Sequence, residues 1–145
     1  MSFERNGMYF ERNGSFIDTP RGSALVYCTD ATFEKGISQE LDYVYNMKEK
    51  LWDYYSDDLV EPGTALLVED VFNLIVKSPN DSSTDIANVK SCLRELKAMM
   101  FEFHIKKIMV SMRSFEEFGI SRLEIHDLFK EAFGDSDANI IFCVR

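Results

Sequence analysis

Two short apolar runs, residues 65–68 and 71–76, stand out in the middle of the chain. Only Glu69 and Asp70 separate them. Short runs that are rich in branched residues and bounded by turn-forming residues predict two antiparallel strands joined by a tight turn. The second strand ends on Lys77, and ligands of open α/β sheets bind beyond the carboxyl ends of the strands. Lys77 is therefore the first candidate for a ligand-binding residue.

Three further apolar runs predict central strands of the same sheet. The run at 24–28 is almost entirely apolar, which is typical of a strand covered on both faces. The runs at 108–110 and 140–144 have the same character.

A small duplication begins the chain, because residues 3–7 and 10–14 have the same sequence. We expect only the second copy to contribute a strand, over residues 8–12, with the Asn-Gly pair as its turn. Chain ends are poorly ordered unless they are tied down, so residues 1–7 are expected to form a flexible extension.

Helical periodicity fills the intervals between these runs. Apolar residues recur at three- and four-residue spacing over 37–55 and 86–100, and a capping box at 121–124 begins a last helix. Residues 111–120 are expected to form a loop. Strands that alternate with helices predict one α/β layered domain with a mixed sheet, over residues 8–145.

The charge and hydropathy of the chain restrict the classes of partner. The formal net charge is -9, which disfavours general nucleic-acid binding, since that binding depends on lysines and arginines placed against phosphates. An anionic small ligand remains compatible, because backbone amides at turns bind phosphate whatever the global charge is. No apolar run approaches the roughly 18 residues that a membrane span needs, so no membrane association is expected.

The three cysteines, Cys28, Cys92 and Cys143, are scattered and lie in apolar runs. This pattern predicts buried thiols in a reducing compartment, hence an intracellular protein of the nucleus or the cytoplasm. His104 and His126 are far apart and have no cysteine or carboxylate beside them at metal-ligand spacing. No metal site is expected.

Two phrases carry a resemblance to a known family. Residues 14–28 are similar to the opening strand, first turn and second strand of the macro domain family. Residues 74–77, with the turn and helix that follow, are similar to the family's catalytic-lysine strand. In particular, the chain resembles small single-domain proteins that remove terminal ADP-ribose from protein glutamates and deacetylate O-acetyl-ADP-ribose. The resemblance implies a three-layer α/β/α macro domain with a mixed, mostly parallel central sheet.

What the resemblance implies about catalysis centres on Lys77. In the family, the strand-end lysine attacks the anomeric carbon of the ribose, and an aspartate in a later glycine-rich loop assists. Lysine suits this role because a partly desolvated ammonium loses its proton more easily. In this chain Phe118 takes the place of the aspartate, and Glu117 serves only if the loop shifts by one residue. The resemblance thus implies Lys77 and Glu117 as catalytic residues and no cofactor.

The resemblance also implies a ligand-binding set that departs from the family at several positions. Ser15 replaces an aspartate that binds adenine, and Ser38 replaces the second glycine of a Gly-x-Gly loop, where a Cβ narrows the approach. The glycines of the family's phosphate cradle are missing, but Arg113 is suited to contact a phosphate, whereas Glu116 repels one unless it points away. The complete set is Ser15, Phe16, Gly36, Ile37, Ser38, Met112, Arg113, Ser114, Phe115, Glu116, Phe118 and Arg145.

Three functions are compatible with these residues. The first is an ADP-ribosyl hydrolase, and the second is a module that binds ADP-ribose or ADP-ribosylated protein without turnover. The third is a pseudoenzyme with a closed pocket whose acidic, aromatic run at 51–58 binds a protein partner. The departures at Ser15, Ser38 and Phe118 favour weakened or lost catalysis.

Overall fold

The computed structural model describes residues 3–4, 9–12, 23–33, 37–55, 60–78 and 80–144. Its centre is a mixed sheet with the strand order β1-β2-β7-β6-β3-β5-β4. The strands β2, β7, β6, β3 and β5 run parallel, whereas β1 and β4 pair antiparallel at the two edges. The strands are β1 (Phe3–Glu4), β2 (Tyr9–Arg12), β3 (Ala24–Asp30), β4 (Thr64–Val68), β5 (Val71–Lys77), β6 (Lys107–Ser111) and β7 (Asn139–Cys143).

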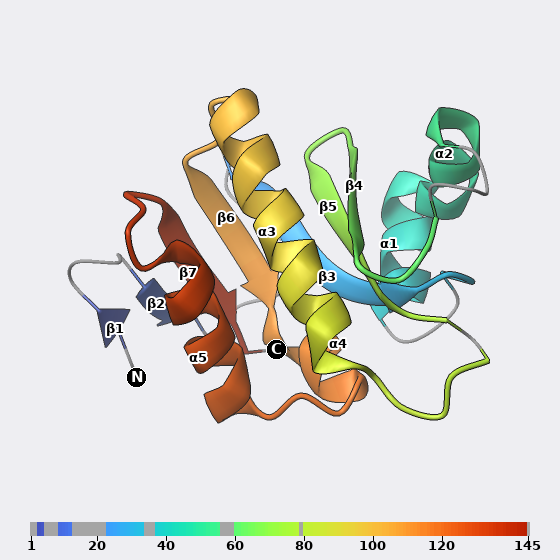
Figure 1. The fold of residues 1–145 in the computed structure, drawn as a ribbon. Helices are drawn as coiled ribbons and strands as arrows, with labels where there is room; N and C mark the ends of the chain where they lie inside the picture. Colours follow the sequence, from blue (N-terminus) through green and yellow to red (C-terminus); the bar gives the residue numbers. More distant parts are fainter. Residues whose placement is uncertain are drawn as a thin grey trace.

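Helices cover both faces of this sheet, so the predicted three-layer α/β/α architecture is confirmed. Figure 1 shows α3 and α5 across the front of the sheet. They enclose one apolar core with α4, and α1 and α2 enclose a second core on the other face. The helices are α1 (Ile37–Tyr45), α2 (Met47–Tyr54), α3 (Ile86–Glu102), α4 (Met112–Glu117) and α5 (Arg122–Phe133).

The hairpin of β4 and β5 forms as the apolar pattern predicts. Val68 pairs with Val71 across the tight connection, and Glu69 adopts a left-handed conformation with φ 55°. The β5 side chains from Val71 to Val76 are all buried, because helices lie on both faces of the sheet at this point. Lys77 is the last residue of β5 and the first residue of the strand that is not fully buried.

Both copies of the N-terminal duplication form strands, which corrects the expectation that only the second copy does. Phe3 pairs with Phe10 and Glu4 with Tyr9 in an antiparallel arrangement. The repeated sequences have the same strand propensity, and the edge of the sheet at β2 offers unpaired backbone groups to the first copy. The strand predicted at 8–12 is present as β2.

The helical pattern at 37–55 is divided into two helices at Asn46. This residue has φ 54° and ψ 45°, a left-handed conformation that asparagine tolerates better than most residues. The turn allows the buried Met47 to enter the core, and the Asp42 carboxylate accepts a hydrogen bond from the Lys48 backbone at 2.9 Å. Our prediction of one continuous helix was therefore wrong at this residue.

Cys28, Cys92 and Cys143 are all buried, as the apolar runs around them predict, and none is in a disulfide. Burial raises the pKa of the Cys92 thiol to about 12, and burial also raises the pKa of Cys28. Thiolate is the reactive form, and a thiol with such a pKa is roughly 1 in 10,000 thiolate at pH 8.

We expect Ellman's reagent at pH 8 to label none of the three thiols within minutes in the folded protein, because all three are buried and burial raises the pKa of Cys28 and Cys92. All three should react at once in guanidinium chloride. The released thionitrobenzoate is measured by absorbance. Rapid reaction of one thiol before denaturation would contradict the buried positions.

Candidate functional site

The candidate site lies at the carboxyl ends of the parallel strands, where the strand order reverses. β3 has β5 on one side and β6 on the other. The chain leaves β3 for α1 on one face of the sheet, and it leaves β6 for α4 on the opposite face. Such divergent connections open a crevice over the strand ends, where ligands of α/β sheets bind. The arrowheads of β6 and β7 in Figure 1 point to this end of the sheet, next to α4.

Lys77 reaches this end of the sheet from β5, as its position in the sequence predicts. It is half-buried and is the register partner of Asp30 at the end of β3. The Lys77 carbonyl accepts a hydrogen bond from the Ala31 backbone at 3.3 Å, which fixes the two strand ends together. Within the described ranges, the Lys77 ammonium forms no ion pair. Lys77 is thus attached to a fixed strand end, and none of the described carboxylates pairs with its ammonium.

Asp30 is a candidate residue that the sequence reasoning missed. It is only 2% exposed, and its carboxylate accepts hydrogen bonds from the backbone and the hydroxyl of Thr32 at 2.9 and 2.6 Å. The apolar run predicted a strand over residues 24–28, whereas β3 continues to Asp30. The available signal was a carboxylate placed two residues after a continuous apolar strand, next to the strand end that carries Lys77.

The segment predicted to replace the phosphate cradle is a helix, α4, and not a loop. Ser111 caps it by accepting a hydrogen bond from the Ser114 backbone at 3.3 Å. Met112, Phe115 and Phe118 recur every third residue and form one apolar face that is 0%, 0% and 7% exposed. This periodicity was present in the sequence, and the resemblance to a glycine-rich loop obscured it. The loop prediction for residues 111–120 was therefore wrong.

Four residues predicted to bind ligand consequently belong to the interior. Met112, Phe115 and Phe118 pack in the core shared with α3 and α5. Ser114 is also buried, where its hydroxyl accepts a hydrogen bond from the Cys28 backbone at 2.9 Å and donates to the Ser111 carbonyl at 2.8 Å. Their side chains hold α4 against the sheet and do not line an open crevice.

The two glutamates of α4 face outward. Glu116 and Glu117 are exposed near its C-terminal end. With a rise of about 1.5 Å per residue, the helix carries Glu117 about 8 Å along its axis from Met112. The shift by one residue was expected of a loop, whereas Glu117 lies in a helix. Its acid role stays a prediction.

Arg113 links the two sides of the crevice. Its guanidinium donates a hydrogen bond to the Glu40 carboxylate of α1 at 2.7 Å, and the two side chains are 44% and 48% exposed. The Nε atom of Arg113 is buried and has no hydrogen-bond partner among the described residues. Glu40 is a second site residue that the sequence did not reveal, because its partner lies 73 positions away.

Ser38 is 2% exposed and does not line an open approach. Its hydroxyl lies 2.7 Å from that of Thr29, so it ties the start of α1 to β3. Ile37 is the first residue of α1. Four other predicted residues lie outside the described part of the chain: Ser15, Phe16, Gly36 and Arg145.

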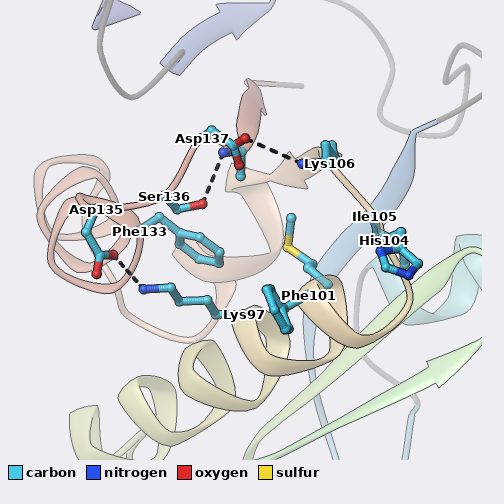
Figure 2. Close-up of a pocket in the computed structure, with 11 residues that line it drawn as sticks. Lys97, Phe101, His104, Ile105, Lys106, Phe133, Asp135, Ser136 and Asp137 are labelled. Carbon is cyan, nitrogen blue, oxygen red and sulfur yellow. Dashed lines mark hydrogen bonds and ion pairs between the residues drawn. The ribbon is translucent and has the colours of Figure 1, made fainter.

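A cavity of about 410 Å³ lies at the other end of the sheet, beside the starts of β6 and β7. Figure 2 shows Lys97 directed at Asp135 and Lys106 at Asp137, with separations of 2.6 and 3.4 Å. The hydrogen bond from Lys97 lowers the pKa of Asp135. The charged groups of this rim are paired with each other, and none of the candidate residues named above lines the cavity.

The described residues contain no group of three His, Cys, Asp or Glu side chains that could hold a metal ion. None of their helices combines the length and the apolar character needed to cross a membrane. His126 packs its ring against Phe142 at 4.6 Å between centroids, and His104 is exposed, as expected for packing and surface histidines.

No protein-family model and no curated protein sequence matches the chain. Several solved structures, however, match its fold. The macrodomain of Mycobacterium tuberculosis DarG is 18% identical and superimposes with a TM-score of 0.79 over 96% of this chain and 99% of that one. The macrodomain of Thermus aquaticus DarG is 15% identical, with a TM-score of 0.76 over 95% and 98%.

A third structure, Thermosipho africanus DarTG in complex with ADP-ribose, is 14% identical. It superimposes with a TM-score of 0.66 over 85% of this chain and 38% of that one. The two DarG matches cover nearly the whole of both chains, and the order of strands and helices agrees with the architecture expected from the sequence. The chain has the macrodomain fold.

Proposed function

We propose that the protein binds ADP-ribose, free or attached to a protein, in the crevice at the carboxyl ends of β3, β5 and β6. The observation that carries this proposal is the half-buried Lys77, held at the end of β5 beside the point where the strand order reverses. Support comes from a structure of the same fold, Thermosipho africanus DarTG, which is described in complex with ADP-ribose.

We further propose that this site removes ADP-ribose from modified glutamates. In this reaction the neutral Lys77 amine attacks the anomeric carbon of the ribose, and the bond to the glutamate oxygen breaks with release of the carboxylate. Water then displaces the lysine, with a carboxylate as general base. Asp30, next to Lys77 in strand register, and Glu117 on α4 are the candidates for this base.

A second candidate function is binding without turnover. The observation that favours it is α4, which lies where the resemblance implies a glycine-rich loop. Phe115, and Phe118 just after the helix, pack into the core. In this case the crevice recognises ADP-ribose on a modified protein, and catalysis is absent.

Calorimetric titration of the purified protein with ADP-ribose tests the shared step. We expect a dissociation constant in the micromolar range, which corresponds to about 8 kcal/mol of binding free energy. AMP serves as the control, because it carries the same adenosine but lacks the distal ribose and the diphosphate. A protein that binds neither ligand at millimolar concentration would refute the proposed function and direct attention to protein partners.

A further inference from the structure

The ion pair of Arg113 and Glu40 connects α4 with α1. Arg113 is the second residue of α4, which follows β6, and Glu40 lies in the first turn of α1, which follows β3. β3 and β6 are neighbours in the sheet, but their helices pack on opposite faces. Their 2.7 Å contact therefore joins the two layers directly over the strand ends.

The two helices that carry Arg113 and Glu40 both contact β3 near this ion pair. On the α1 side, the buried Ser38 contacts Thr29 of β3. On the α4 side, the buried Ser114 accepts a hydrogen bond from the backbone of Cys28, also in β3. Both helices are therefore hydrogen-bonded to the same strand next to the ion pair.

The Arg113 guanidinium is only partly satisfied by this contact. One terminal nitrogen binds Glu40, and the buried Nε has no partner among the residues that the structure describes. A guanidinium binds an oxyanion best through two parallel hydrogen bonds. Because Nε is buried, an anion can form both bonds only after the Arg113 side chain releases Glu40 and turns outward.

We propose that Glu40 gates the crevice by keeping the Arg113 guanidinium in an ion pair. A diphosphate that binds in the crevice replaces Glu40 as the partner of this guanidinium. This inference rests on the proposed function for the identity of the natural ligand, ADP-ribose. Glu40 then lowers the affinity of the site for anions, because the ligand must first break the ion pair. An ion pair that is about half exposed is weak, so a ligand with two charged phosphates can break it. Glu40 acts through Arg113 and is a positioning residue, not a catalytic one.

Calorimetry on matched variants tests this proposal with two probes, ADP-ribose and inorganic pyrophosphate. We expect Glu40→Gln to bind both about fivefold more tightly than the unmodified protein, the gain typical of releasing one partly exposed ion pair. Asp127→Asn, which removes one exposed charge from α5, is the control for net charge and should change affinity less than twofold. Circular dichroism confirms that each variant is folded.

The double-mutant cycle with Arg113→Gln isolates the pair. If Glu40 acts by holding the arginine, Glu40→Gln should have no effect beyond the Asp127→Asn control once Arg113 is replaced. Tighter pyrophosphate binding in Glu40→Gln without any ADP-ribose binding would support the gate and refute the proposed ligand. If Glu40→Gln and Asp127→Asn have the same affinity for both probes, or bind neither, the gate is overturned. A gain in affinity from Glu40→Gln that persists in the Arg113→Gln background would also overturn it.

Discussion

Replacement of Phe115 by alanine is expected to lower the free energy of unfolding by about 3–5 kcal/mol, the usual cost of truncating a buried phenylalanine. Phe115 is 0% exposed, and its ring meets that of Phe129 edge-on at 5.7 Å. Phe129 in turn contacts Phe133 and Phe142 at 5.8 and 5.3 Å. Loss of the Phe115 ring therefore leaves a cavity at the margin of an aromatic cluster that joins α4, α5 and β7.

Chemical denaturation with guanidinium chloride measures this loss, and Glu116→Ala is the matched control. Glu116 is the next residue of the same helix and is exposed, so its truncation should change the free energy of unfolding by less than about 0.5 kcal/mol. The sequence resemblance places Phe115 in a ligand loop. A Phe115→Ala protein of unchanged stability and lower ligand affinity would restore that reading and contradict the interior position of the side chain.

Much of the fold was predictable because burial on two faces leaves a simple pattern. The continuous apolar runs of β3, β5, β6 and β7 identify central strands, and the capping box of Ser121 and Glu124 marks the start of α5. These signals are local and depend on few neighbours. The macrodomain fold expected from the resemblance agrees with the solved structures.

The candidate site was less predictable because it depends on contacts between distant residues. Lys77 could be found, since its position at a strand end follows from the run before it. Glu40 carries no signal of its own, and its role appears only when Arg113 is brought beside it. Asp30 was missed because the predicted strand ended two residues before it. The helix α4 was missed because the resemblance outweighed the apolar spacing of Met112, Phe115 and Phe118.

Replacement of Lys77 by alanine is expected to abolish release of ADP-ribose from glutamate-modified protein, with a loss of about a thousandfold or more, if the site is catalytic. Binding should change little, because the crevice is formed by several strand ends and by Arg113. Lys77 is half-buried, so its truncation should have a small effect on stability. Release of ADP-ribose is measured by chromatography, and binding is measured by calorimetry on the same preparations.

Lys77→Arg decides what kind of contribution the lysine makes. Arginine keeps the positive charge at the end of β5, but its guanidinium does not lose a proton near neutral pH and cannot serve as a neutral amine nucleophile. If Lys77 attacks the ribose, Lys77→Arg should be as inactive as Lys77→Ala while it still binds ADP-ribose. Substantial turnover in Lys77→Arg would show that the residue acts through its charge alone. Turnover in Lys77→Ala at the unmodified rate would exclude Lys77 from the chemistry.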